Sequence, residues 1–455
     1  SISEQQSSVM SKIIQKAFLP ILLKRTFEHT KFTLALLNKK SGKDKSFTKI
    51  DVASEYPVLN EKVKKIRQFW QGNTTKILNR WQTDKKEIAE IIFGVSEIGD
   101  IDVFSQEKGD EHQEGEQSLV LELTCGRKLC YKPRCLLIED AFYKFASQLG
   151  FTELYQAKYL VKENYGWMEY ISQQSCSETS QIELYYFRSG LLLSLLYILE
   201  AEDIHHENVI AFGSNPVIVD LETLFHHRDD SIYSEGKGDV ELELGNHTVL
   251  KTHFIPQFFN QKSDQEQAAI FTVFDETTPK KNSTPQLNGK PIAVNDFIEH
   301  FIKGFGEGYR RILSNKTALT KNNDLFNGFS SGKARYICRS THIYARLLEA
   351  SQHSSYQQSF ESQDKLFDKL TLDIEERPFL EKFIELEKQS LTCGEIPRFS
   401  HNIAEKGVWF NNTLIRANYF SHSGIEFCQK KIKLLSAEDM QGQIKLIRCS
   451  FELAK

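Results

Sequence analysis

The sequence has few of the features that mark secreted disulfide-rich or zinc-binding proteins. Its eight cysteines are irregularly spaced over 455 residues, which does not fit a disulfide framework. Cys125, Cys130 and Cys135 recur every five residues, but an odd spacing on a strand places successive side chains on opposite faces. We therefore expect neither a disulfide scaffold nor a zinc site in this chain.

Long apolar runs and an excess of one charge are also missing. The longest apolar run, residues 190–201, is too short to cross a bilayer, and no signal peptide is recognisable. Lysine and arginine number 57 against 61 aspartate and glutamate residues, for a net charge of −4. No global basic field therefore favours nucleic acid or an anionic membrane. These absences predict a cytoplasmic protein with no membrane span and no nucleic-acid partner.

Helical and extended patterns of apolar residues divide the chain into regions. Several regions are expected, because 455 residues is more than a single hydrophobic core normally serves. Apolar residues recur at helical spacing over 1–94, where Gly94 is expected to end the last helix. Short strand-like segments follow over 95–175, and helical patterns return over 176–455. A charged, turn-rich stretch at 228–293 predicts an irregular insertion in the last region.

Two local patterns predict how particular helices lie. Ser436 and Asp439 form a possible capping box at the start of the last helix. An aromatic residue at every fourth position of one stretch predicts a stripe that faces the core, comprising Phe297, Phe301, Phe305 and Tyr309.

Three polar residues stand in an order that suits phosphoryl transfer. Asp203 and Asn208 lie five positions apart, and Asp220 follows the short apolar segment 217–219. Phosphoryl transfer needs a carboxylate that orients the attacking hydroxyl group and two oxygen ligands that hold Mg²⁺ against the phosphates. Each residue alone is typical of a turn or a strand end, but the ordered triple favours a phosphotransferase centre.

A lysine for the phosphates is also present upstream. Lys132 lies between apolar residues about 70 positions before Asp203, in the order expected of a kinase. The segment 165–171 between them indicates the strand that passes the adenine in kinases. A GxGxxG loop ahead of the lysine is missing, and single glycines stand there instead, Gly109 and Gly115. The chain is therefore not an ordinary protein kinase.

Several segments together carry a family resemblance. In order along the chain they are GDEHQEG at 109–115, YKPR at 131–134, DIHHENVIAFGSNPVIVDLETLF at 203–225, RYICRSTHIYARLL at 335–348, GEIPRF at 394–399 and LSAEDMQGQIKLIR at 435–448. The chain thereby resembles the dehydratase domain of class II (LanM-type) lanthipeptide synthetases over about residues 75–455.

The resemblance implies a fold and an activity. The fold would be α+β and kinase-like, with a small β-rich N-lobe, a larger helical C-lobe and additional N-terminal helices. The activity would be an ATP- and Mg²⁺-dependent dehydratase acting on a ribosomally made precursor peptide of leader plus core. It phosphorylates Ser or Thr and then eliminates phosphate to give dehydroalanine or dehydrobutyrine.

The resemblance also implies roles for single residues. Lys132, Asn208 and Asp220 would bind ATP, and Asn208 and Asp220 would hold the metal. The catalytic set would comprise Asp203, His205, Arg335, Thr341, Asp110, His112 and Lys132. Arg335 and Thr341, six apart, match the elimination motif, in which a forked cation suits a departing phosphate.

Alternatives remain for the chain and for single residues. Full-length members continue into a zinc cyclase, and this chain stops where that domain would begin, so a separate or C-terminally fused cyclase is the expected partner. A phosphotransferase that stops at the phosphorylated product is the second hypothesis, and a noncatalytic peptide-binding pseudoenzyme the third. His112 and His205 also fit ordinary surface histidines, and Arg335 also fits a solvated basic face.

Overall fold

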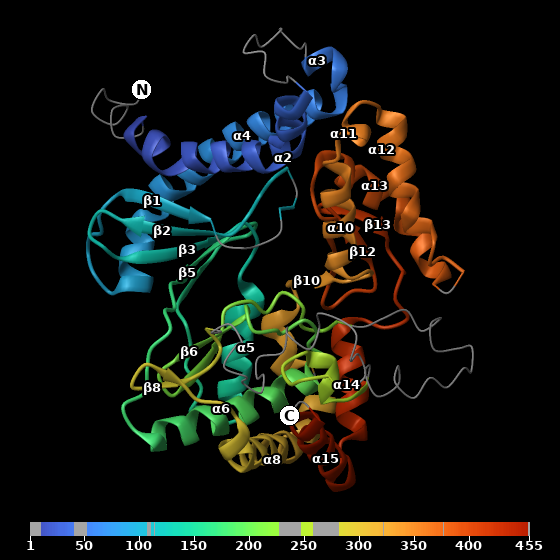
Figure 1. Cartoon of the computed structure of the whole chain (residues 1–455). Helices are drawn as coiled ribbons and strands as arrows, with labels where there is room; N and C mark the ends of the chain where they lie inside the picture. Colours follow the sequence, from blue (N-terminus) through green and yellow to red (C-terminus); the bar gives the residue numbers. More distant parts are fainter. Residues whose placement is uncertain are drawn as a thin grey trace. The chain divides into compact units, whose positions relative to one another are not determined.

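The computed structural model describes residues 11–40, 52–106, 111–112, 114–226, 247–257, 282–321, 323–375 and 377–453. These residues form many helices and several small sheets, so the chain is an α+β protein, as predicted (Figure 1). The candidate residue Asp110 and much of the predicted insertion at 228–293 lie outside the described residues.

The chain divides into two compact units, which we describe separately. The first unit comprises Ser1–Arg134, Lys158–Tyr170 and Ile337–Phe399, and the second comprises Cys135–Ala157, Ile171–Tyr336 and Ser400–Lys455. The region boundaries predicted from the sequence are not tested by this grouping and stay predictions. In the part of the chain that the structure describes, no helix is long and apolar enough to cross a membrane.

The first unit begins with helices, as the apolar spacing predicted. A π-helical turn, η1 (Ile14–Phe18), leads into α2 (Leu19–Lys40), and α3 (Val52–Glu55) precedes α4 (Pro57–Ile88). The proline at the start of α4 suits a position whose N–H group would have no helical partner. The helix ends through η2 (Ala89–Phe93) at Gly94, whose φ of 65° confirms the predicted stop.

An antiparallel sheet of five strands follows in the order β1-β2-β3-β5-β4. The strands are β1 (Ile101–Gln106), β2 (Leu119–Leu123), β3 (Lys128–Lys132), β4 (Tyr159–Val161) and β5 (Gly166–Glu169). Their apolar side chains form one core with the helices, in which Phe18, Trp81 and Trp167 are buried. Lys132 ends β3 opposite Gly166 in β5, the strand predicted from the segment 165–171.

The rest of the first unit is a group of short helices. They are α10 (Thr341–Ser351), α11 (Ser354–Gln357), α12 (Phe360–Phe367), η7 (Asp368–Thr371), η8 (Pro378–Phe383) and α13 (Ile384–Cys393). They share a small apolar core that includes Tyr344, Phe367 and Leu391.

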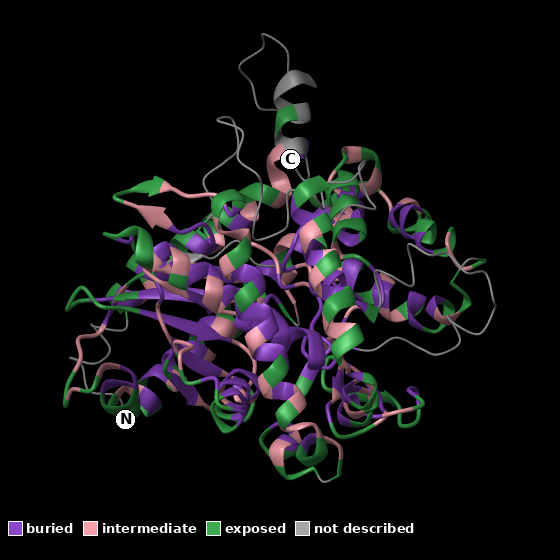
Figure 2. Cartoon of the chain, turned by 90° about the horizontal axis from the view of Figure 1, so that it is seen from below, coloured by how far each residue is buried: buried purple, intermediate pink, exposed green. Residues whose placement is uncertain are grey.

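The second unit is built around two tightly packed helices, α6 (Thr179–Ile198) and α8 (Ile298–Ser314). A Cβ at Gly190 would lie 2.0 Å from the Phe301 carbonyl oxygen, and one at Gly304 would lie 1.9 Å from that of Phe187. Only glycine therefore permits this close approach. The C-terminal half of α6 is buried over residues 189–198, and Figure 2 colours buried residues purple.

Smaller elements complete the second unit. The helices are α5 (Leu137–Gln148), η4 (Val249–Thr252), η5 (Asn295–Phe297), α9 (Lys316–Lys321), η6 (Asp324–Phe329), α14 (Gly424–Leu434) and α15 (Ala437–Leu453). The strands are β6 (Val209–Phe212), β7 (Asn215–Ile218), β8 (Gln286–Leu287), β9 (Lys290–Pro291), β10 (Lys333–Tyr336), β11 (Phe399–Asn402), β12 (Val408–Phe410) and β13 (Thr413–Arg416).

Candidate active site

The loop that follows α6 carries Asp203 in an unusual backbone conformation. Its φ is +61°, and Glu200 just before it has a φ of +51°. Residues other than glycine rarely adopt this left-handed region, and those that do cluster at functional sites. Surrounding hydrogen bonds hold the conformation: the Asn208 side-chain amide donates to the Asp203 carbonyl at 2.9 Å, and the Ile204 N–H donates to the Thr252 carbonyl at 2.9 Å.

The β6–β7 hairpin brings Asn208 and Asp220 close along the backbone. Val209 pairs with Ile218, and just beyond this pair the Val219 N–H donates to the Asn208 carbonyl at 2.9 Å. Asn208 therefore lies beside the residue that precedes Asp220. The two predicted metal ligands, twelve positions apart in the sequence, are joined by the end of one hairpin.

The chemistry of this pair fits Mg²⁺. The amide nitrogen of Asn208 is engaged by the Asp203 carbonyl, which leaves its side-chain oxygen as a donor to a metal. Magnesium typically takes one or two protein ligands and completes its shell with phosphate and water oxygens. Within the described ranges, no group of three or more His, Cys, Asp or Glu side chains could hold a metal on its own. A cation at Asn208 and Asp220 would thus depend on nucleotide oxygens.

Asp220 is followed by a segment that reaches Arg335. The Glu222 N–H donates to the Asp220 carboxylate at 3.2 Å, and the Glu222 carboxylate accepts from the Arg335 guanidinium at 3.0 Å. Arg335 lies on β10 with its side chain 11% exposed. The interpretation of Arg335 as a freely solvated basic face is therefore wrong. Glu222 thus connects Arg335 to the segment that begins at Asp220.

A network of buried charges lies at the start of the loop that carries Asp203. The Glu200 carboxylate accepts from Lys251 at 2.6 Å and from Lys431 at 2.8 Å, and all three side chains are almost fully buried. Burial alone would raise the pKa of Glu200, but the two ammonium groups hold it below its usual value. Lys251 also donates to the His226 carbonyl at 2.6 Å. The network ties the start of the loop that carries Asp203 to the end of the segment that begins at Asp220.

His226 lies in a loop at the end of the segment that begins at Asp220. Its side chain is fully buried, and its Nδ1 lies 2.5 Å from the Glu202 carboxylate. The Glu202 carbonyl also accepts from the Thr223 hydroxyl group. His227, beside it in the sequence, lies outside the described residues. His226 therefore serves the packing of this loop and is no ordinary surface histidine.

In the first unit, the GDEHQEG and GEIPRF segments are joined by hydrogen bonds. The Ile396 N–H donates to the Glu111 carbonyl at 3.0 Å, and the His112 Nδ1 lies 2.8 Å from the Ile396 carbonyl. The Gly115 N–H donates to the Glu395 carboxylate at 2.6 Å. Burial raises the pKa of Glu395 to about 7. Two motifs separated by some 280 residues thus form one structure.

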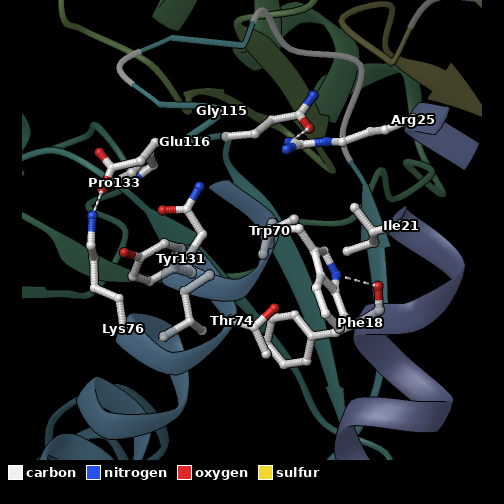
Figure 3. Close-up of a pocket in the computed structure, with 14 residues that line it drawn as sticks. Phe18, Ile21, Arg25, Trp70, Thr74, Lys76, Gly115, Glu116, Tyr131 and Pro133 are labelled. Atoms are coloured by element: carbon white, nitrogen blue, oxygen red, sulfur yellow. Dashed lines mark hydrogen bonds and ion pairs between the residues drawn. The ribbon is translucent and has the colours of Figure 1, made fainter. Parts of the chain in front are cut away.

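A hollow of about 420 Å³ lies beside this loop (Figure 3). Phe18, Ile21 and Trp70 give it an apolar wall, and Arg25 and Lys76 stand at its rim. Both cations are paired, Lys76 with Glu116 at 2.6 Å and Arg25 with Glu111 at 2.9 Å.

Thr341 and its neighbour Arg339 also belong to the first unit. Thr341 is the first residue of α10 and is half-buried. Arg339 is buried, and its guanidinium donates to Asp373 at 2.6 Å and to Glu387 at 3.1 Å. These two carboxylates and the Leu370 carbonyl, at 3.1 Å, hold the Arg339 guanidinium in place.

The second unit thus brings together five of the predicted residues, namely Asp203, His205, Asn208, Asp220 and Arg335. The first unit carries three more: Lys132 on β3, His112 in the GDEHQEG segment and Thr341 on α10. Sequence analysis missed Glu139, whose buried carboxylate accepts from the Leu221 N–H at 3.2 Å. It also missed His253, which lies 3.8 Å from the Asp203 carboxylate. No sequence pattern marks either residue.

Comparison with known proteins agrees with the motifs. The family described as "Domain of unknown function (DUF4135)" matches residues 56–276 and 264–402. The chain belongs to this family. It is 27% identical, over 91% of its length, to the Lacticin 481/lactococcin biosynthesis protein LcnDR2 of Lactococcus lactis subsp. lactis. The chain spans 48% of that relative. The resemblance of this DUF4135 chain to LanM-type lanthipeptide synthetases is confirmed.

Proposed function

We propose that the chain is the dehydratase part of a lanthipeptide synthetase. In this proposal it phosphorylates Ser or Thr of a ribosomal precursor peptide with ATP and then eliminates the phosphate. One observation carries the proposal: the Asp203–Asn208 loop, the Asp220 segment and Arg335 form one hydrogen-bonded assembly. The similar Lactococcus protein, whose name places it in lacticin 481 biosynthesis, supports it independently.

In the first reaction, Asp203 orients the hydroxyl group of the peptide. The hydroxyl oxygen bonds to the γ-phosphorus and its proton passes to the Asp203 carboxylate, while the bond from that phosphorus to the bridging oxygen breaks and ADP leaves with the electron pair. Asn208 and Asp220 would hold Mg²⁺, which supplies charge neutralisation on the phosphates. Lys132, buried at the end of β3, would add a second positive charge.

In the second reaction, the α-proton of the phosphorylated residue is removed. Its electron pair forms the Cα–Cβ double bond as the Cβ–O bond breaks and phosphate leaves. Arg335 suits this leaving group, because a guanidinium binds two phosphate oxygens at once. Thr341 is the proposed hydrogen-bonding partner. Candidates for the proton transfers are Lys132, Asp110, His112 and His205.

A kinase-like, two-lobed fold is part of the proposal. It is supported by the five-stranded antiparallel sheet, in which strand β3 ends at Lys132. The largely helical second unit, which carries the Asp203 loop and the β6–β7 hairpin, also supports it. Such an enzyme would act in the cytoplasm on a leader–core precursor peptide, with a separate or C-terminally fused cyclase as its partner.

The two reactions can be tested separately. A synthetic peptide that already contains phosphoserine is incubated with the protein, Mg²⁺ and ADP, the nucleotide that the first reaction leaves behind. The proposal predicts release of inorganic phosphate and formation of dehydroalanine. A protein that phosphorylates peptides with ATP but leaves the phosphopeptide intact would be a phosphotransferase only. A protein that does neither would be a noncatalytic peptide-binding pseudoenzyme.

A further inference from the structure

Two histidine rings lie near the carboxylate of Asp203. His205, from its own loop, places Nε2 3.9 Å from Oδ1, and His253 places Nδ1 3.8 Å from the same oxygen. His253 comes from a segment 50 residues further along the chain. Both rings and the carboxylate are partly exposed, with side-chain exposures of 23%, 29% and 34% for His205, His253 and Asp203. The group is therefore open to a substrate.

The segment that carries His253 is held firmly on the catalytic loop. The turn η4 (Val249–Thr252) ends directly before it, and the Thr252 carbonyl accepts from the Ile204 N–H at 2.9 Å. In the same turn, the buried Lys251 pairs with Glu200 at 2.6 Å. His253 is thus placed by contacts with residues on both sides of Asp203.

The backbone of His253 is costly for a histidine. Its φ is +57°, in the left-handed region that glycine and asparagine adopt far more readily. A position of this kind favours glycine unless the side chain has a use. Nδ1, the ring nitrogen nearer to the backbone, is the atom that lies 3.8 Å from the Asp203 carboxylate.

We propose that His253 is a positioning residue for Asp203 in the phosphoryl-transfer reaction. The inference rests on the proposed function. In the free protein His253 Nδ1 and His205 Nε2 lie 3.8 Å and 3.9 Å from Oδ1 of Asp203, and with a substrate in place the Nδ1–H group of His253 would donate to this oxygen. Contacts of this length commonly shorten to hydrogen bonds when a substrate is in place. Oδ2 is then left for the hydroxyl group of the peptide.

Because His253 has a left-handed backbone, its side chain can be replaced without straining the fold. His253→Gly removes the ring and relieves the backbone, so the fold should be kept or slightly stabilised. His253→Asn also tolerates this conformation and places its amide nitrogen where Nδ1 stands, so it keeps the donor. Asn288→Gly, at a φ of +50° in the β8–β9 turn, is the matched control for relief of the backbone alone.

The measurement is the initial rate of phosphate transfer from ATP to a precursor peptide, counted as phosphorylated plus dehydrated product. His253→Gly should lower kcat about 10- to 100-fold with little change in the KM for ATP. His253→Asn should restore most of the rate, and Asn288→Gly should match the wild type. Thermal midpoints of all variants should be at or above that of the wild type.

Other results would distinguish failure of the positioning role of His253 from failure of the proposed function. If the wild type transfers phosphate and His253→Gly is equally fast, the positioning role is overturned while the proposed function stands. The same conclusion follows if the Asn variant is as slow as the Gly variant. A wild-type protein that transfers no phosphate to any precursor peptide would overturn the proposed function and this inference together.

Discussion

Arg335 and Glu222 are joined twice. The Glu222 carboxylate accepts from the Arg335 guanidinium at 3.0 Å, and the Glu222 carbonyl accepts from the Arg335 N–H at 2.6 Å. The double contact fixes both the strand and the side chain of Arg335 against the segment that begins at Asp220.

Replacing Arg335 should separate the two proposed reactions. In Arg335→Met, phosphate transfer to the peptide should persist, but elimination should fall at least about 100-fold because the leaving phosphate loses its forked partner. Mass spectrometry would then show phosphorylated peptide accumulating. Arg416→Met, which alters an exposed arginine on β13, is the control and should dehydrate normally. A dehydrating Arg335→Met variant would remove the basis for this role.

Loss of Asp220 should stop the first reaction. Asp220→Ala removes one of two metal-binding oxygen ligands, so neither phosphorylated nor dehydrated peptide should form. Thermal unfolding should show that the variant is folded, since Asp220 is only half-buried. Asp296→Ala, at an exposed aspartate of η5, should keep full activity. Normal phosphorylation by Asp220→Ala would exclude this residue as a metal ligand.

Thr341→Ala should resemble the Arg335 variant in kind but be less severe. The change removes one hydroxyl group from the start of α10 and no charge. A single neutral hydrogen bond contributes about 0.5–1.5 kcal/mol, which corresponds to a roughly tenfold loss of elimination. The ratio of phosphorylated to dehydrated peptide after a fixed time measures it. An unchanged ratio would exclude Thr341 from the elimination step.

The residues that sequence analysis placed correctly were those in local patterns. The helices before Gly94 and the strands around Lys132 follow from the spacing of apolar residues. Phe301, Phe305 and Tyr309 are buried as the predicted stripe requires, and Phe297, at the edge of the stripe, is half-buried. The Ser436 hydroxyl accepts from the Asp439 N–H at 3.1 Å. This is one of the two hydrogen bonds of the predicted capping box, and it is confirmed.

Contacts between distant segments could not be predicted. His253 reaches Asp203 only because Thr252 pairs with Ile204, and no periodicity connects these positions. The same holds for Glu395 and Gly115, whose segments were each recognised but not as partners. Such contacts depend on the packing of the whole unit, which a single sequence does not reveal.

The buried network at Glu200 should be important for stability. Glu200→Gln removes the charge that compensates Lys251 and Lys431, so the free energy of unfolding should fall by about 3–5 kcal/mol. Urea denaturation followed by circular dichroism measures this loss. Glu405→Gln, at an exposed glutamate, should change stability by less than about 0.5 kcal/mol. Equal stability of the two variants would contradict the assignment.

Glu395 should make stability depend on pH. Its folded-state pKa is raised from 4.5 to about 7, chiefly by burial. The folded state therefore binds the proton more tightly, and the stability that this provides is complete below about pH 4.5 and lost as the pH rises through 7. The size is on the order of 3 kcal/mol.

The test of Glu395 compares Glu395→Gln with the wild type by urea denaturation at pH 5 and pH 8. Glutamine stays neutral and can still accept from the Gly115 N–H, so the variant should gain stability relative to the wild type at the higher pH. Glu385→Gln, at an exposed position of α13, should show no such change. A stability difference that is the same at both pH values would contradict the raised pKa.

The central claim is that one chain both phosphorylates and dehydrates a precursor peptide. The most direct test is mass spectrometry of a candidate precursor peptide after incubation with the protein, ATP and Mg²⁺. The account predicts a loss of about 18 Da per modified site, because phosphorylation followed by elimination removes one water overall. A gain of about 80 Da per site, the mass of a retained phosphoryl group, would contradict it and leave a phosphotransferase.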